Sequence, residues 1–221
     1  MSKAILISIK PQYVAKILNG EKSIEVRKNK ALYKATMKLI EEQGYATFFM
    51  YCSKDKSVKT LLYRPTKSLE CSHYINGKVV AKFTVRKVEH YRCMVQIAPK
   101  LVRVILKTTH LYSEQEKELL NNILENSCLS EEEFGKYLEK ETTAFSGFYA
   151  YHIEDLVIFD KPKELSDFMP IKWNKCGVKD KNGLYQCDKC PYGEVLPYGS
   201  ECHYKSLKRS PQNFCYVESE E

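Results

Sequence analysis

The sequence lacks any hydrophobic run long enough to cross a membrane, although 43% of its 221 residues are hydrophobic. A transmembrane helix needs about 20 consecutive apolar residues, and the apolar run near the N-terminus covers only residues 4–9. That run is also too short for the core of a signal peptide, and no small-residue cleavage site follows it. We therefore expect an intracellular, cytoplasmic protein without a membrane partner.

Common catalytic signatures are absent as well. The chain contains no P-loop, no nucleophile elbow and no H-E-x-x-H metalloprotease motif. Their absence excludes the most easily recognised classes of nucleotide hydrolase, serine hydrolase and zinc peptidase. Any enzymatic chemistry must then come from another group of residues.

Cysteine, in contrast, is abundant, with nine residues in the chain. A reducing compartment disfavours disulfides, so free thiols and metal ligands are expected. Cys187 and Cys190 form a C-x-x-C pair, with Cys176 before it and Cys202 after it. Four thiolates are a ligand set of tetrahedral structural zinc and leave no open position for catalysis. The spacing therefore predicts a structural zinc site at Cys176, Cys187, Cys190 and Cys202.

The residues around these cysteines, 171–209, are rich in glycine and proline and poor in apolar side chains. A bound metal would supply the order that a hydrophobic core cannot provide there. Two alternatives stay open for the ligand set. His203 can replace one thiol, and Cys215 can displace Cys176, although Cys215 is more simply a small hydrophobic residue of a strand. A redox C-x-x-C is disfavoured, because no βαβ pattern surrounds it.

The net charge of +7 hides an acidic segment. Residues 113–141 contain nine acidic and three basic side chains, so the rest of the chain is strongly basic. Apolar residues recur at helical spacing within this segment, and Ser130 with Glu133 fits a capping box. We expect a pair of amphipathic helices with a solvated acidic face. The basic remainder suits a partner that carries phosphates, such as RNA or a nucleotide.

Residues 20–27 carry the pattern G-x-K-x-x-E-x-R. Before them, Pro11 suits the first turn of a helix and Gly20 suits a left-handed helix end. From residue 23 the apolar pattern has a period of two, which predicts a strand whose polar face carries Glu25 and Arg27. Lys22 lies at the junction and can reach the same face. We expect these charges to converge on one ligand, although a surface ion pair would give the same pattern.

The neighbouring elements follow from similar signals. A helix is expected over residues 29–44, a strand over 46–52, and a hairpin turn at Asn76-Gly77 before a strand over 78–88. The basic residues between 54 and 77 are expected in a solvated loop. Tyrosines and phenylalanines among the strand residues should mostly fill the core, although exposed rings could stack on bases.

This order of elements, with Gly20, Lys22, Glu25 and Arg27 behind a strand and a short helix, resembles the ASCH domain family, a branch of the PUA-like β-barrels. Residues 147–168 resemble the late strands of that family, and residues 210–217 resemble the closing segment of its phage and bacterial subset. The resemblance implies an α+β fold, a mixed β-barrel with flanking helices, a helical insertion and the small zinc-binding Cys-rich insert.

The same resemblance suggests how the chain is divided. An ASCH domain would span residues 1–170, with insertions at about 54–77 and 94–142. The Cys-rich insert would span 171–209, and the strand that closes the barrel would span 210–217.

The resemblance implies that the cleft binds RNA, a nucleotide or a modified nucleobase. Lys22 and Arg27 would engage phosphate or carbonyl oxygens, while Glu25 would accept hydrogen bonds from a base or orient both cations. The expected ligand-binding residues are Lys10, Lys22, Glu25, Arg27 and Gln212.

A second function is implied by the same family. One bacterial branch removes the acetyl group from acetylcytidine with a lysine at the position of Lys22, so the alternative is an amidohydrolase or an RNA hydrolase that uses Lys22 and Glu25. That enzyme has threonine where this chain has Glu25, and Lys82 or Thr84 stands where an acidic residue would be sought. A carboxylate beside Lys22 favours its protonated form, which suits binding better than attack on an amide.

Overall fold

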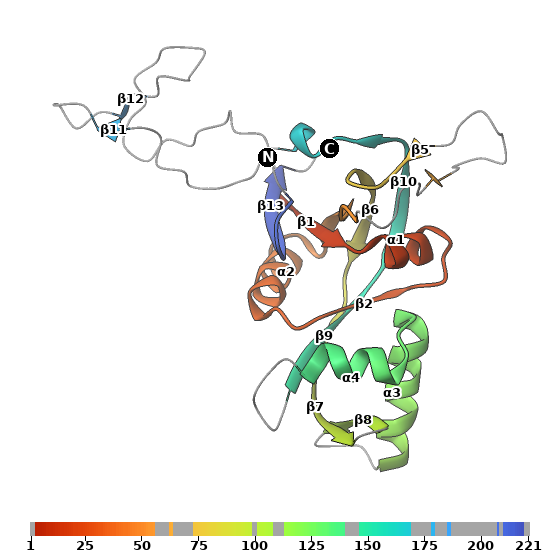
Figure 1. Cartoon of the computed structure of the whole chain (residues 1–221). Coiled ribbons are helices and arrows are strands. Elements are labelled where there is room, and N and C mark those ends of the chain that lie inside the picture. Colours follow the sequence, from red (N-terminus) through yellow and green to blue (C-terminus); the bar gives the residue numbers. More distant parts are fainter. Residues whose placement is uncertain are drawn as a thin grey trace.

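A computed structural model describes residues 3–55, 62–63, 73–98, 101–107, 113–139, 146–168, 178–179, 185–186, 207 and 210–218. The fold is α+β, as predicted, and consists of two main sheets with helices packed on them (Figure 1). In chain order the elements are β1 Lys3–Ile9, α1 Pro11–Leu18, β2 Ile24–Arg27, α2 Lys30–Gln43, β3 Ala46–Cys52, β4 Leu62–Tyr63, β5 His73–Tyr74, β6 Val79–Val85, β7 Val88–Ala98, β8 Leu101–Lys107, α3 Ser113–Ser127, α4 Glu131–Glu139, β9 Ser146–His152, β10 Glu154–Lys163, η1 Leu165–Asp167, β11 Val178–Lys179, β12 Tyr185–Gln186 and β13 Phe214–Glu218.

The first helices begin and end where local chemistry places them. Pro11 opens α1, and Gly20 follows its end with a left-handed φ of +78°. The Asn29 side chain accepts a hydrogen bond from the backbone of Leu32 at 2.9 Å and so caps α2. Gly44, with φ of +82°, ends that helix. These boundaries confirm the predictions from the sequence.

The larger sheet has the strand order β10-β6-β3-β1-β13. Strand β1 runs parallel to β3 and antiparallel to β13, with Lys3 opposite Glu218. The C-terminal segment therefore returns to the sheet beside the first strand; the sequence predicted a closing strand over residues 210–217, and the pairing begins at Phe214. Helices α1 and α2 cover one face and bury Val14, Ile17 and Leu32 against β1 and β3.

The smaller sheet has the order β2-β9-β7-β8. Helices α3 and α4 cover one face of it, burying Ile123 and Phe134 against apolar residues of β2, β8 and β9. The capping box is present: Glu133 N donates to Ser130 Oγ at 3.2 Å, and Ser130 N donates to Glu133 Oε2 at 3.1 Å. The pair of helices is thus confirmed. The helical insertion expected over residues 94–142 also contains β8 and the end of β7.

Strand pairing among the described residues does not close a barrel. The edges of the larger sheet are β10 and β13, and those of the smaller sheet are β2 and β8. The sheets are joined because β9 continues through Ile153 into β10. In the part of the chain that the structure describes, the expected closed barrel is therefore not formed, and two open sheets are present. Each sheet buries an apolar face against helices, so neither needs to close on itself to bury that face.

The predicted zinc ligands Cys176, Cys187, Cys190 and Cys202, together with the alternative His203, lie outside the described residues. Cys215 is described and is buried among Leu6, Phe49 and Val217, which suits the small hydrophobic role expected for it. Within the described ranges, no three His, Cys, Asp or Glu side chains form a group that could hold a metal. Among the described helices, none is both long enough and apolar enough to span a membrane.

Candidate nucleotide-binding cleft

A cleft of about 610 Å³ opens along the edge strand β2, between the start of α1 and helix α4. Ligand sites commonly have volumes of about 300–1,000 Å³. Its walls contain five cations, two carboxylates and two tyrosine rings. The lining residues are Ser8, Ile9, Lys10, Gln12, Tyr13, Lys22, Glu25, Val26, Arg27, Lys28, Leu129, Glu133, Lys136 and Tyr137.

Lys22 lies at the back of this cleft and is only 3% exposed. Its Nζ donates to the carbonyl of Ile24 at 2.7 Å and to that of Ser127 at 2.8 Å, and it lies 3.3 Å from Glu25 Oε2. An ammonium has three donors, and here three oxygens are within reach of them. The Tyr13 ring adds a cation–π contact at 5.4 Å. The surroundings of Lys22 therefore suit a charged donor.

The contact with Ser127 also ties the helical part to the rest of the fold. The last carbonyls of a helix have no partners within that helix and carry partial negative charge. Lys22 reaches one of them, and Lys16 Nζ reaches the carbonyl of the next residue, Cys128, at 3.4 Å. Ser23 N donates to the carbonyl of Asn126 at 2.9 Å. The turn between α1 and β2 thus caps the C-terminus of α3.

Glu25 joins the two cations of the pattern. Its Oε2 faces Lys22, and its Oε1 lies 2.8 Å from Arg27 Nε, while the residue is 7% exposed. The N–H of Arg27 Nε does not point at that oxygen well enough for a hydrogen bond, so this contact is an ion pair by proximity. Arg27 Nη2 donates to the carbonyl of Ser8 at 2.6 Å. The structure thus brings Lys22, Glu25 and Arg27 together, as expected.

The two predicted rim residues lie differently. Lys10 is exposed and lines the cleft where α1 begins, and α1 has neither a side-chain cap nor an acidic residue in its first turn. Gln212 is exposed but is not among the lining residues. Its neighbour Pro211 is closer, because the Pro211 carbonyl accepts a hydrogen bond from Ser8 Oγ at 2.9 Å. The C-terminal segment therefore passes beside the cleft without adding Gln212 to its wall.

The wall formed by α4 was not predicted. Lys136 and Tyr137 face the cleft from α4, and Lys28 lies opposite, with its Nζ 5.1 Å from the centre of the Tyr137 ring. Nothing in the spacing of the acidic segment indicated that α4 would reach the G-x-K-x-x-E-x-R turn. Lys28 was not predicted either, although it directly follows the pattern in the sequence and could have been found from that position.

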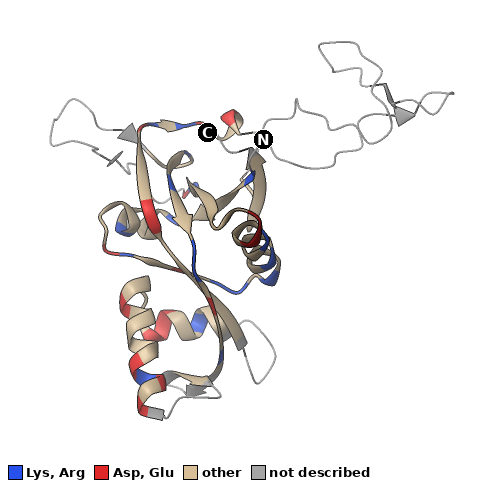
Figure 2. Cartoon of the chain, turned by 180° about the vertical axis from the view of Figure 1, so that it is seen from behind, with Lys and Arg blue, Asp and Glu red and all other residues tan. Residues whose placement is uncertain are grey.

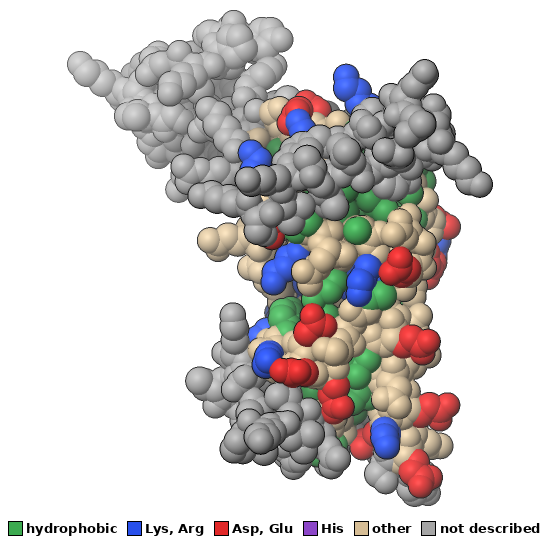
Figure 3. Space-filling model, turned by 45° about the vertical axis from the view of Figure 1, so that its right-hand side comes forward, with side chains coloured by type: hydrophobic (Ala, Val, Ile, Leu, Met, Phe, Trp, Pro, Cys, Tyr) green, Lys and Arg blue, Asp and Glu red, His purple; other side chains and the backbone are tan. Residues whose placement is uncertain are grey.

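Charge is distributed unevenly over the molecule. Acidic side chains gather on α3 and α4, in the lower part of the molecule (Figure 2, Figure 3). The cleft itself has more cations than carboxylates. Burial raises the pKa of the Tyr13 phenol, and the carboxylates of Glu133 and Glu25 raise it further. Tyr13 therefore keeps its proton at neutral pH and presents a neutral ring and a hydroxyl donor to the cleft.

Comparisons with known proteins find only distant similarity. No protein-family profile matches the sequence, and no curated protein matches it. Solved structures that resemble the chain include the ASCH protein of Zymomonas mobilis, at 14% identity, 73% coverage of each chain and a TM-score of 0.39. A mutant of that same protein is 15% identical, with 74% and 77% coverage and a TM-score of 0.39. The N-terminal domain of Staphylothermus marinus McrB is 10% identical, with 76% and 82% coverage and a TM-score of 0.38.

Proposed function

We propose that this protein binds RNA, a nucleotide or a modified nucleobase in the cleft along β2. The observation that carries this proposal is the composition of one cavity of about 610 Å³, in which Arg27 of β2, Lys136 of α4 and three lysines of the connecting segments face two tyrosine rings. Phosphates are bound by lysine and arginine, and bases stack on aromatic rings. The chemistry of the walls therefore matches both halves of a nucleotide.

Within this proposal the predicted residues have distinct roles. Glu25 and Lys22 position Arg27, because the carboxylate contacts both cations and is itself nearly buried. Each carboxylate oxygen has more than one acceptor site, so Glu25 can still accept a hydrogen bond from a base. Lys10 and Arg27 are better placed to meet a phosphate, since Lys10 is exposed and the Arg27 side chain is 20% exposed.

The geometry around Lys22 counts against the alternative of an amidohydrolase or RNA hydrolase. A general base or nucleophile needs a free lone pair on Nζ. Here Nζ donates to two carbonyls and lies 3.3 Å from a carboxylate, so its N–H groups point at oxygens and no lone pair is presented to a substrate. No observation on the described residues favours hydrolysis over binding.

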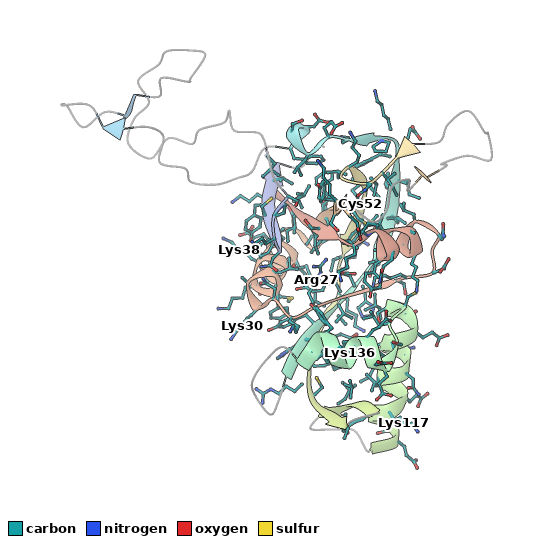
Figure 4. All side chains as sticks on the ribbon, in the orientation of Figure 1. Arg27, Lys30, Lys38, Cys52, Lys117 and Lys136 are labelled. Carbon is teal, nitrogen blue, oxygen red and sulfur yellow. The ribbon has the colours of Figure 1, made fainter. Side chains whose placement is uncertain are left out.

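The proposal can be tested by native mass spectrometry after incubation with a nucleoside and oligonucleotide digest of total RNA. The unmutated protein should retain a ligand, and Arg27→Met and Lys10→Ala should each weaken its binding about tenfold, the cost of losing a hydrogen bond to a charged group. Lys117→Ala is the matched control, because Lys117 is an exposed cation at the far end of α3 (Figure 4).

Binding to Arg27→Met and Lys10→Ala that is as tight as binding to the unmutated protein would contradict the proposed cleft. Depletion of one nucleoside by the unmutated protein, with no ligand retained, would favour the hydrolase instead. If neither retention nor depletion is seen, a partner bound through the Cys-rich region becomes the better explanation of function.

A further inference from the structure

Tyr33, His90 and Tyr149 form a group of stacked rings close to the cleft, which we call the aromatic platform. The Tyr149 ring centre lies 4.4 Å from that of Tyr33, with 15° between the ring planes. It lies 4.7 Å from that of His90, with 21° between the planes. Tyr149 is only 6% exposed, whereas His90 is exposed and Tyr33 is half-buried. The platform is therefore a buried ring covered by two rings that solvent can reach.

Strand pairing in the smaller sheet connects the cleft with the platform. Arg27 of β2 pairs with Tyr149 of β9, and Tyr149 pairs with His90 of β7. Paired residues on neighbouring antiparallel strands lie on the same face, with Cβ atoms about 5 Å apart. Arg27, Tyr149 and His90 thus form one row on one face. Arg27 contributes to the cleft, and Tyr149, the first ring of the platform, lies on the strand next to it. A ligand bound at Arg27 is therefore within one strand spacing of the platform.

Cations border the platform. Lys30 and Arg92 are both exposed and lie close enough to His90 to affect its titration. Burial lowers the pKa of the His90 imidazole, and Arg92 and Lys30 lower it further, so the neutral ring is favoured at neutral pH. In Figure 4, Lys30 and Lys136 both lie below Arg27, Lys30 to the left and Lys136 to the right. Positive side chains therefore extend from the cleft to the platform.

The position of the His90 ring depends on a glycine in the neighbouring strand. A Cβ atom added to Gly147 would lie 3.3 Å from His90 Nε2, which is tighter than ordinary van der Waals contact. Gly147 therefore leaves room for the imidazole to lie against β9 and to stack on Tyr149.

We propose that the aromatic platform stacks one base of a single-stranded polynucleotide whose neighbouring nucleotide occupies the cleft. Rings among cations along a shallow path are the usual means of binding single strands, because every base has a face that can stack. Lys30 and Arg92 would contact the backbone phosphates. This inference rests on the proposed function and narrows its ligand to an oligonucleotide rather than a free nucleoside.

The test compares two ligands on the same variants by fluorescence anisotropy. One is a labelled single strand of about eight nucleotides, within the usual site size of such proteins; the other is the uridine mononucleotide, measured by competition. His90→Ala should weaken binding of the single strand about five- to 150-fold, the cost of losing a base stack. It should leave mononucleotide affinity unchanged. His90→Phe keeps a ring and should restore binding.

Tyr45→Ala is the matched control, because Tyr45 is 42% exposed and lies beyond the other end of α2. It should bind both ligands like the unmutated protein. Parallel titrations with oligo-rU and oligo-dT separate RNA from DNA as the source of the single strand.

The outcomes separate this inference from the proposed function. If the mononucleotide binds and Arg27→Met weakens that binding about tenfold, the proposed cleft is supported. Unchanged affinity of His90→Ala for the single strand would then overturn the platform alone, as would an equal loss for both ligands. If the unmutated protein binds neither ligand, both proposals are wrong.

Discussion

Three oxygen acceptors lie within reach of Lys22 Nζ, and one of them is the carbonyl of Ser127 at the end of α3. Removing the ammonium would leave the Glu25 carboxylate buried with only Arg27 nearby, and it would leave two carbonyls without a donor. Breaking a buried ion pair from one side typically costs about 3–5 kcal/mol. We expect Lys22→Met to lower the free energy of unfolding by about 3 kcal/mol, measured by urea denaturation.

Lys16→Met is the control for this prediction. Lys16 also reaches a carbonyl at the end of α3, but it does so at 3.4 Å from a partly buried position. Its loss should cost less than about 1 kcal/mol, the usual range for a partly exposed charge at a helix end. If Lys22→Met leaves the free energy of unfolding unchanged, Lys22 does not stabilise the fold. A direct role of Lys22 in binding or hydrolysis would then be the better explanation.

At the scale of single elements, the helix boundaries could be predicted because their causes are local. Gly20, Asn29, Gly44 and the Ser130 capping box each act within a few residues of their position in the sequence. The pairing of β7 with β8 could not be found in this way. Its apolar residues are buried by α3 and α4, and the proximity of those helices is a property of the fold.

The same distinction applies to the candidate site. The charges within residues 20–27 lie in one turn and one strand, so their proximity follows from a period of two. Lys136 and Tyr137 reach the cleft only because the turn before β2 caps α3, through contacts that span more than 100 residues of sequence. No pattern within either segment encodes that contact, so the second wall of the cleft could not be predicted.

Residues 169–206 contain all four predicted zinc ligands, and the two residues that flank this stretch meet on the fold. Leu207 N donates to the Phe168 carbonyl at 3.1 Å, and Leu207 packs against the buried cluster that contains Phe168. A segment whose ends already meet can be replaced by a short linker at little cost in loop entropy. We therefore expect a variant with a Gly-Ser linker in place of residues 169–206 to fold with an unchanged circular dichroism spectrum.

Zinc content is the second measurement on that variant. The predicted ligands all lie in the replaced segment, so the full chain should contain one zinc per molecule by elemental analysis and the linker variant none. Cys187→Ser in the full chain should also lose the metal. Chelation should leave the unfolding transition of the two sheets in place. Loss of the whole fold on replacement or chelation would contradict this division of the chain.

At the scale of the whole molecule, the separation of charge has a consequence for specificity. Acidic residues gather on α3 and α4 (Figure 2), and the cleft that α4 helps to line has an excess of cations. Such an arrangement repels phosphates that approach over the helices and attracts those that approach along β2, where Arg27 and the aromatic platform lie. A polyanion would therefore be guided toward one path.

Acid should lower the stability of the whole molecule in two stages. Both stages are expected from the protonation of side chains on β7 of the smaller sheet, His90 and Glu89. Burial, Arg92 and Lys30 lower the pKa of His90 in the folded state, so its contribution to stability is present above about pH 6.5 and is lost as the pH falls through the lower folded value. Burial acts in the opposite direction on Glu89, but hydrogen bonds from His152, Lys87 and Tyr91 outweigh it and lower the pKa of that carboxyl. Its contribution is present above about pH 4.3 and is lost below that value.

Both side chains are partly exposed, so each stage should be worth less than about 1 kcal/mol. Urea unfolding measured between pH 8 and pH 3 should show a shallow decline beginning near pH 6.5 and a second near pH 4, values set by the ordinary pKa of histidine and glutamate. His90→Phe should remove the first stage, because phenylalanine does not titrate, and Glu89→Gln should reduce the second. Glu114→Gln, a carboxylate in the exposed first turn of α3, should change neither stage. If the decline near pH 6.5 persists in His90→Phe, a group other than His90 causes it. The position of His90 on the platform would then not account for the loss of stability at that pH.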